Sequence, residues 1–574
     1  MFSRHLGRES AQIWMSVLGL LASLVITACQ RTQLQDRSAE ETPKNVLIIV
    51  ADDVGYTDLG YMGGEIPTPN IDQLASEGVV LTSFYTAPTC SPTRAMLLTG
   101  VDAHQVGLGS MGEVIADNQQ GLEGYEGYLN KRAATLAEVL EGHGFDTFMA
   151  GKWHLGADRS HTAFARGFGH AFEMSYGGAS HFSDMQGPTT HQRKAQYLDD
   201  GEPVSKLPED FYSSDFYADW IISKIRGSVA DEKPFFGYLA FTAAHWPLQV
   251  PDADIDRFKG RYDDGYDKLR TLRIEGLKDK GIIGGEVGGS PSKPIVTEWA
   301  MLSDDERQYE ARKMEVYAAM ISNLDENVGR VMAALKESGE LDRTIIIFMS
   351  DNGAEGNPLA GPLFDDWVAE HDNSLENIGR RNSFVTLGPG WAEASSGPLR
   401  SFKAYTAEGG IRVPAIIRVP DLAEPGKIED HIVIVQDLFP TIIDLLLGGA
   451  GVDLEDKNRD LTLSGESVAQ LLTESASSEG IQDRVLGWEL FGRTAIRRGN
   501  WKALIDKNKP GERVWELYNL DEDLGEHVDQ ATRFPDILES LKTDFDDYSA
   551  ENGVVMPSNV PAYGQPTDAA PEHN

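Results

Sequence analysis

Four apolar runs of strand length recur along the chain, each rich in branched or aromatic residues. Such continuous runs are typical of strands that are buried on both faces of a parallel sheet. A stretch from about Tyr309 to Gly339 instead places its apolar residues at helical spacing and leads into the last run. Alternating strand and helix patterns predict an α/β fold with a large mixed, mostly parallel sheet flanked by helices. The runs are NVLIIV (45–50), FDTFMA (145–150), FFGYLAF (235–241) and TIIIFM (344–349).

The C-terminal part of the chain has a different pattern. After an apolar helix at 437–449, the segments GWELFG, RTAIRRGNWKALID and RVWELYNL are typical of short strands joined by turns, which predicts a smaller antiparallel sheet. We therefore expect a large domain over 44–455 and a C-terminal α+β subdomain over 456–553. Residues 554–574 are polar and rich in proline, and we expect a disordered tail there.

The N-terminus predicts a targeting segment. Arg4 and Arg8 precede the apolar run IWMSVLGLLASLVITA, which is short and soon followed by polar residues, so residues 1–28 are interpreted as a signal peptide. Its end, ITAC, resembles the lipobox of bacterial lipoproteins, so Cys29 is expected to carry a lipid and residues 29–43 to form a tether. The alternative is an ordinary signal peptide with an incidental cysteine.

Either interpretation predicts an exported protein, as an outer-membrane lipoprotein or in the periplasm. Gln30 after the lipidated position favours outer-membrane sorting by analogy. The expected contact with a membrane is through the lipid alone, and the expected oligomeric state is a monomer.

Charge restricts the classes of partner. The 574 residues include 51 basic and 90 acidic side chains, for a net charge of −39. So acidic a surface argues against binding of nucleic acid or an anionic membrane through charge. If the substrate is an anion, local cations must overcome this repulsive field.

Cys90 has no disulfide partner in the mature chain if Cys29, the other cysteine, is lipidated. Ser91 and Pro92 suit the N-cap and first turn of a helix that AMLLTG continues, which predicts Cys90 at a helix N-terminus. Free amides and the helix dipole favour an anion there, and Arg94 follows one turn later. Cys90 is thus either a buried residue with no chemical role or a residue that takes part in the reaction.

Acidic residues follow two of the predicted strands. Asp52 and Asp53 come after the first run, and Asp351 and Asn352 follow the last. Each pair alone is equally typical of a turn or a helix cap. Because open α/β sheets gather the carboxyl ends of their strands at one edge, three carboxylates would repel one another there unless a cation bound them. Carboxylate and amide oxygens suit calcium or magnesium.

Basic residues are expected at the same end of the sheet. Lys152 and His154 follow the second run, His245 follows the third, and Lys403 lies in the segment SFKAYTAEGGIRVP. Each alone has an ordinary structural explanation, as a solvated charge, a hydrogen bonder or a loop residue. Their common placement, together with Arg94, predicts a local positive field for an anionic substrate.

The motifs together resemble the type I sulfatases, and in particular bacterial arylsulfatases of the Pseudomonas type. CSPTRAMLLTG is similar to the family's Cys-x-Pro-x-Arg motif, and GFDTFMAGKWHLG is similar to its second motif. The resemblance spans about Asn45 to Gly553 and implies an alkaline-phosphatase-like fold. It also rests on VADDVGYTDLGYMGGEIPTPNID, FTAAHWPLQVP, KMEVYAAMISNLDENVGRV, MSDNGAEG, DNSLENIGRRNSF and GGIRVP.

The resemblance implies a function for each candidate residue. Cys90 would be oxidised by a formylglycine-generating maturation enzyme to Cα-formylglycine, whose hydrate attacks sulfur and forms a covalent sulfoenzyme intermediate. One Ca²⁺, rather than Mg²⁺, would be held by Cys90 together with Asp52, Asp53, Asp351 and Asn352. The sulfate-binding and catalytic groups would be Arg94, Lys152, His154, His245 and Lys403.

The implied reaction is hydrolysis of an aryl sulfate ester to a phenol and sulfate. Two alternatives remain: a formylglycine-dependent phosphodiesterase or phosphonate monoester hydrolase, and a non-catalytic lipoprotein that binds sulfated glycans. The sequence leaves open small aryl sulfates and sulfated polysaccharides as substrates. Residues 354–398, with Trp367, His371 and Trp391, are expected to form either a rim over the leaving-group pocket or an ordinary surface loop.

Overall fold

The computed structural model describes most of the chain from residue 44 to residue 559. The described ranges are 44–284, 296–361, 364–420, 422, 424–448, 461, 463–473, 484–506 and 513–559. The predicted signal peptide, Cys29 with its tether, the domain boundary at 455 and residues 560–574 of the predicted tail lie outside these ranges. Among the helices that are described, none has the length and apolar character needed to cross a membrane.

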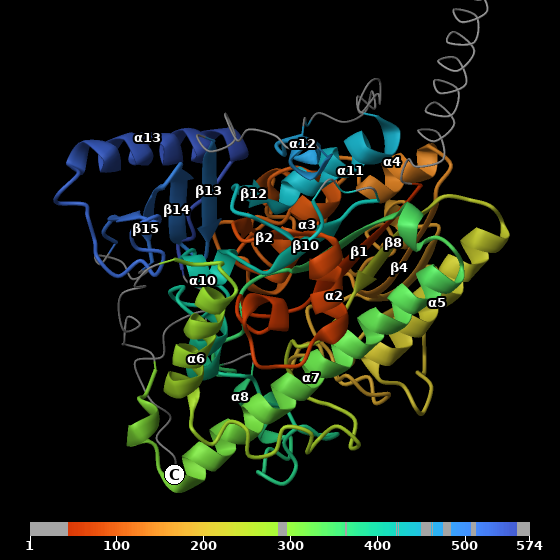
Figure 1. The fold of residues 1–574 in the computed structure, drawn as a ribbon, viewed down its shortest axis with the longest axis horizontal. Helices are drawn as coiled ribbons and strands as arrows, with labels where there is room; N and C mark the ends of the chain where they lie inside the picture. The colour runs from red at the N-terminus through yellow and green to blue at the C-terminus, as the bar shows by residue number, and fades with distance from the viewer. Residues whose placement is uncertain are drawn as a thin grey trace, which may run out of the picture.

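A ten-stranded sheet forms the centre of the large domain (Figure 1). Its strands are β1 (Asn45–Ala51), β2 (Val79–Leu81), β4 (Asp146–Lys152), β5 (His170–Met174), β6 (Tyr197–Asp199), β7 (Glu202–Pro203), β8 (Phe235–Ala240), β9 (Thr344–Ser350), β10 (Ala415–Arg418) and β11 (Lys427–Glu429). They lie in the order β11-β2-β10-β9-β1-β8-β4-β5-β6-β7. The central strands from β9 to β5 are all parallel, and antiparallel pairs lie toward both edges. The predicted mixed, mostly parallel sheet is therefore confirmed.

The alternation of side chains on β1 divides the core into two layers. Leu47 and Ile49 belong to the layer covered by α2 (Pro69–Glu77), α5 (Ser213–Ala230) and α7 (Asp304–Glu337). Val46 and Ile48 belong to the opposite layer, covered by α3 (Cys90–Thr99), α4 (Leu136–Gly142), α11 (Leu438–Leu447) and α12 (Ala469–Thr473). Because both faces are covered, the central strand β1 is apolar from Val46 to Ala51.

The long helix α7 begins five residues before the predicted start at Tyr309. Ser303 is the N-cap, since its side chain accepts a hydrogen bond from the Glu306 amide while the Glu306 carboxylate accepts one from the Ser303 amide. This capping box lies upstream of the apolar periodicity, so the periodicity alone places the start too late.

Smaller elements complete the large domain. The short helices are α6 (Tyr266–Asp279), α8 (Asp365–Ala369), α9 (Pro389–Ser396) and α10 (Glu408–Ile411), and β3 (Phe84–Tyr85) pairs with β12 (Val433–Ile434). The 3-10 helices are η1 (Gly60–Met62), η2 (Ala103–Gln105), η3 (Gly112–Val114), η4 (Phe164–Arg166), η5 (Trp299–Met301), η6 (Leu341–Arg343) and η7 (Val435–Asp437).

A separate four-stranded antiparallel sheet follows in the C-terminal part, as predicted. It consists of β13 (Val485–Leu490), β14 (Arg493–Arg498), β15 (Trp501–Ile505) and β16 (Glu516–Asn519), and α13 (Pro535–Asn552) packs on it (Figure 1). The buried Lys502 ammonium joins it to the large domain, because its Nζ lies 2.8 Å from Glu408 Oε1 and 2.9 Å from Glu526 Oε1.

The first residues of the predicted tail are held against the large domain. The Val555 carbonyl accepts a hydrogen bond of 2.6 Å from Gln119 Nε2, and the Val555 amide donates one of 2.8 Å to the Tyr125 hydroxyl. The Ser558 amide donates to Asn118 Oδ1 at 2.7 Å. Residues 554–559 therefore form an ordered strap over the loop at 118–125.

Candidate active site

The neighbouring strands β1 and β9 bring two acidic pairs together at their carboxyl ends. Asp52, Asp53, Asp351 and Asn352 are all fully buried. The Asp53 amide donates to Asp351 Oδ1 at 3.3 Å, and Asn352 Nδ2 donates to Asp53 Oδ1 at 2.6 Å. Asp53 has a left-handed backbone with φ of 62°, which turns the chain sharply after the strand. The cluster predicted from the sequence is thus assembled.

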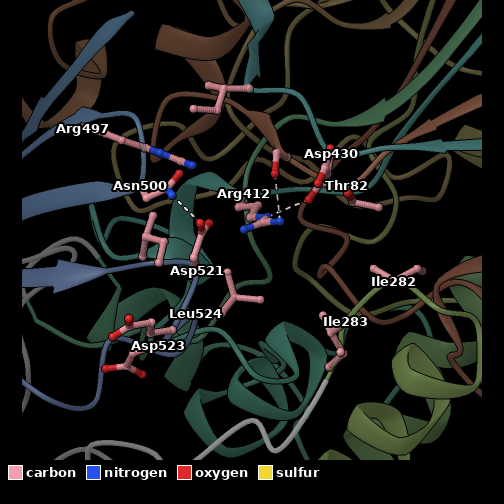
Figure 2. Close-up of a pocket in the computed structure, with 15 residues that line it drawn as sticks. Thr82, Ile282, Ile283, Arg412, Asp430, Arg497, Asn500, Asp521, Asp523 and Leu524 are labelled. Atoms are coloured by element: carbon pink, nitrogen blue, oxygen red, sulfur yellow. Dashed lines mark hydrogen bonds between the residues drawn. The ribbon is translucent and has the colours of Figure 1, made fainter. Parts of the chain in front are cut away.

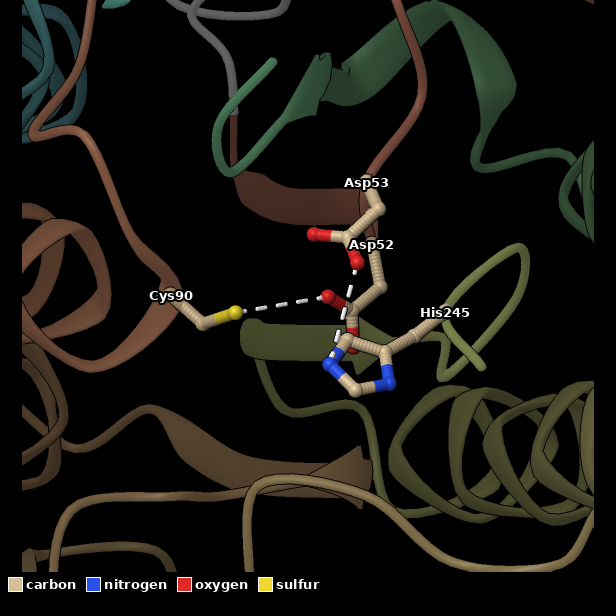
Figure 3. A group of neighbouring side chains, drawn as sticks. All are labelled: Asp52, Asp53, Cys90 and His245. Atoms are coloured by element: carbon tan, nitrogen blue, oxygen red, sulfur yellow. Dashed lines mark hydrogen bonds and ion pairs between the residues drawn. The ribbon is translucent and has the colours of Figure 1, made fainter. Parts of the chain in front are cut away.

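Cys90 is the first residue of α3. Its side chain points toward Asp52 (Figure 3). The helix begins at Cys90 itself with Thr89 at the N-cap, so Ser91 lies inside the first turn rather than at the cap. The thiol Sγ donates to Asp52 Oδ1 at 3.6 Å. Burial and then the Asp351 charge raise the pKa of the Cys90 thiol well above its ordinary range. An unmodified Cys90 is therefore a poor source of thiolate.

Three buried cations pair with the carboxylates. Arg94 donates to Asp351 Oδ2 from Nε at 3.0 Å and from Nη2 at 2.7 Å. Lys152 Nζ donates to Asp52 Oδ2 at 2.7 Å. Burial alone would raise the pKa of Asp351, but Arg94 and then the two lysines lower it overall. Lys403 Nζ lies 2.9 Å from a carboxylate oxygen of Asp53, so all three predicted cations are present.

Both predicted histidines lie at the site. His154 Nε2 lies 3.3 Å from each carboxylate oxygen of Glu113, which η3 carries. His245 Nδ1 lies 2.7 Å from the Trp246 carbonyl, an acceptor, so Nδ1 carries a proton and Nε2 holds the lone pair of the neutral ring. His245 Nε2 lies 3.7 Å from Asp53 Oδ2.

Two consecutive glycines allow the chain to pass the two imidazole rings. A Cβ atom on Gly177 would lie 2.7 Å from His154 Cε1, which is closer than carbon atoms approach in proteins. One on Gly178 would lie 3.1 Å from His245 Cε1. The pair therefore lets the backbone at 177–178 pack directly on both rings.

The carboxylate and amide oxygens of the site suit a hard divalent cation. One ligand atom from each of Asp52, Asp53, Cys90 and His245 lies within 4.8 Å of the others (Figure 3). Asn352 Oδ1 is buried and has no hydrogen-bond partner among the described residues, as expected for an oxygen that coordinates a metal ion. Burial raises the pKa of Asp53 to about 8 even though Lys403 opposes the shift, so a bound cation would hold this carboxylate ionised.

Two acidic residues of the site were not predicted from the sequence. Glu113 follows no strand and lies in a glycine-containing loop, where nothing in the sequence distinguishes it from a solvated charge. Glu355 lies four residues after Asp351 in the motif MSDNGAEG. Its Oε2 lies 3.3 Å from Lys403 Nζ and accepts a hydrogen bond from Trp246 Nε1 at 3.3 Å. The position of Glu355 in that motif is the feature of the sequence from which its role could have been predicted.

An apolar cluster adjoins His245, whose ring centroid lies 4.5 Å from that of Trp246. The predicted rim at 354–398 divides between this cluster and the core, because Trp367 belongs to the cluster whereas Trp391 packs between Tyr266 and Trp299. The buried members of the cluster are Met111, Trp246, Phe364, Trp367, Phe384, Ala404, Leu490 and Phe491.

A separate cavity of about 320 Å³ lies between the large domain and the C-terminal sheet (Figure 2). Arg412 and Arg497 line it, but Arg412 donates to the Thr82 carbonyl at 2.7 Å and Arg497 donates to the Tyr85 hydroxyl. None of the candidate residues predicted from the sequence lines this cavity, which is therefore distinct from the candidate site.

The comparisons with known proteins agree on one family. The sequence model of the sulfatase family matches residues 44–449. The chain is 43% identical over 534 residues to an uncharacterized sulfatase of Schizosaccharomyces pombe, covering 91% of this chain and 96% of that protein. It is 42% identical over 421 residues to an arylsulfatase of Klebsiella aerogenes, covering 72% and 88%. The solved structure of Ps i-CgsB superposes with a TM-score of 0.62 at 25% identity, covering 90% and 95%.

The chain therefore belongs to the sulfatase family. It is a sulfuric ester hydrolase, as the resemblance of its motifs implied.

Proposed function

We propose that the chain hydrolyses aryl sulfates, with Cys90 in its formylglycine form and with one Ca²⁺ bound. One observation carries this proposal: two groups of buried side chains, one acidic and one basic, lie together beside Cys90. The oxygen ligands come from the ends of β1 and β9, and the cations come from α3, β4 and the loop that carries Lys403.

A hydrated aldehyde at Cys90 would supply the oxygen nucleophile that the buried thiol does not, and Ca²⁺ would lower the pKa of the attacking hydroxyl and stabilise charge on the sulfate. Asp52, Asp53, Asp351 and Asn352, together with the formylglycine at position 90, are the residues that would hold the ion. Oxygen donors of this kind favour Ca²⁺ or Mg²⁺ over transition metals.

The cations would bind the sulfate oxygens and offset the charge that develops on them. Arg94, Lys152 and Lys403 each pair with one of the carboxylates. A divalent ion bound to the same carboxylates would compete for them and free N–H donors for the sulfate. In a chain of net charge −39, this local group is what would attract an anionic ester.

The two histidines would transfer the protons that the reaction requires. His245, once protonated at Nε2, would donate that proton to the departing phenolate, and His154 would remove the proton that is lost when sulfate is released. The apolar cluster around Trp246 adjoins His245 and suits an aromatic leaving group better than a sugar, whose hydroxyls need hydrogen-bond partners.

Rates on matched esters test this proposal. We expect purified protein with Ca²⁺ to hydrolyse 4-nitrophenyl sulfate with a higher kcat/KM than bis(4-nitrophenyl) phosphate, and Cys90→Ala to abolish both activities. The opposite ranking would favour the phosphodiesterase alternative. Binding of sulfated glycans without turnover of any sulfate ester would favour the non-catalytic alternative.

We also propose that the protein is exported and anchored through a lipid on Cys29. This proposal is supported by the sequence of residues 1–43 alone, where basic residues, an apolar run and the lipobox-like ITAC follow one another.

A further inference from the structure

Glu113 fixes which nitrogen of His154 carries the proton. Both carboxylate oxygens of Glu113 lie 3.3 Å from His154 Nε2, and an ionised carboxylate can only accept hydrogen bonds. The Glu113 side chain is 28% exposed; its partial burial alone would raise its pKa, but the neighbouring His154 lowers the pKa to about 2, so Glu113 is an ionised acceptor at neutral pH. In the neutral ring, Nε2 must therefore be the protonated nitrogen and Nδ1 the basic one.

The other nitrogen of the ring is buried and free. His154 Nδ1 has no hydrogen-bond partner among the described residues. The His154 ring packs on Gly177, and the His154 backbone lies in the left-handed region with φ of 55°. A buried ring nitrogen left without a hydrogen-bond partner lowers stability, so such a nitrogen is a candidate for a role in function.

We infer that Glu113 is a positioning residue that holds His154 in the tautomer whose Nδ1 accepts a proton inside the site. The inference rests on the proposed function of the same site. Release of sulfate from the carbon derived from Cys90 breaks a C–O bond, whose electron pair leaves with the sulfate. The hydroxyl that remains on that carbon loses its proton to Nδ1 and becomes a carbonyl, so no oxidant or reductant is needed. An aspartate that orients a catalytic histidine gives the same kind of help in serine proteases.

The tautomer can be measured without any reaction. In the Cys90→Ala protein labelled with ¹⁵N-histidine, and with His154 assigned through His154→Gln, we expect the His154 signals of a protonated Nε2 and an unprotonated Nδ1. Glu113→Leu should abolish this preference. The matched control is Glu123→Leu, because Glu123 lies on the same loop, pairs with Arg132 and has a side chain that is 71% exposed. A protonated Nδ1 in the parent protein, or an unchanged pattern in Glu113→Leu, would overturn the inference.

Turnover supplies a second test. Glu113→Leu should lower kcat about a hundredfold with little change in KM, and a sulfate adduct should accumulate on the peptide that contains Cys90. Glu113→Gln should recover part of kcat, because its amide oxygen can still accept from Nε2. Unchanged kcat in Glu113→Leu at an unchanged melting temperature would refute the positioning role. If the parent enzyme hydrolyses no sulfate ester, the proposed function fails instead, and the NMR result still decides the role of Glu113 in orienting the ring.

Discussion

Arg94 holds Asp351 through two hydrogen bonds to the same oxygen, from Nε at 3.0 Å and from Nη2 at 2.7 Å. Its Nη1 donates a third bond to the Lys152 carbonyl at 2.9 Å. One buried guanidinium thus ties the first turn of α3 to the ends of β9 and β4. Because its donors form a planar, rigid fork, it fixes the distance between Cys90 and the acidic cluster.

Arg94→Ala is expected to lower kcat/KM for an aryl sulfate by about a hundredfold or more, because a buried clamp on developing charge is lost. It should also lower the free energy of unfolding by about 3 kcal/mol, since Asp351 loses its partner inside the protein. The control is Arg159→Ala, whose exposed side chain pairs with Glu202 at the surface. Near-normal kcat/KM in a folded Arg94→Ala protein would refute the role of Arg94.

Removal of calcium should inactivate and destabilise the enzyme. Chelation would leave the buried carboxylates of Asp52 and Asp53 without the cation that holds them ionised. An ion present at a hundred times its Kd contributes about 3 kcal/mol to the free energy of unfolding. We expect Ca²⁺ to restore both activity and melting temperature, and Asp53→Asn to respond weakly. A chelated protein with unchanged activity would contradict the metal site.

The sequence predicted the acidic half of the site better than its other parts. Asp52 and Asp351 each follow a long apolar strand, and such strands are recognisable and end at one edge of the sheet. Lys403 lies outside any regular element, so it was expected at the site only as one of a group of basic residues and through the family resemblance. Glu113 reaches His154 from a loop of 3-10 structure, and no periodicity encodes that approach.

Some parts of the fold could not be predicted either, because no local sequence pattern indicates them. The strands β2, β10 and β11, on one side of the sheet, are three or four residues long, which is too short for a periodic pattern to emerge. Residues 554–559 have the sequence VVMPSN, and their order comes from hydrogen bonds to the distant loop at 118–125, which composition does not reveal.

Stability should fall between pH 6.5 and 9 because of one buried histidine. Burial alone would lower the pKa of His104, but the hydrogen bond to Asp102 and the nearby carboxylate of Glu489 raise it from 6.5 to about 9. A pKa raised by folding contributes stability that is complete below the unfolded value and is lost as the pH rises through the folded one. We expect a loss on the order of 3 kcal/mol over this interval.

Chemical denaturation at several pH values tests the role of His104. His104→Gln should flatten the profile between pH 6.5 and 9, whereas His191→Gln, at an exposed position, should leave it as in the parent. An equal slope in the parent and in His104→Gln would show that another group is responsible.

Lipidation of Cys29 should place the protein in the detergent phase of a Triton X-114 extract from its own host. Cys29→Ala should move it to the aqueous phase without changing kcat, because the active site lies in a separate part of the chain. Equal membrane retention of the Cys29→Ala protein would refute the anchor.

The most direct test of the account is the mass of the peptide that contains Cys90, from active protein purified from its own host. The account predicts the mass of formylglycine at this position, with activity in proportion to the modified fraction. An unmodified cysteine in fully active protein would contradict it.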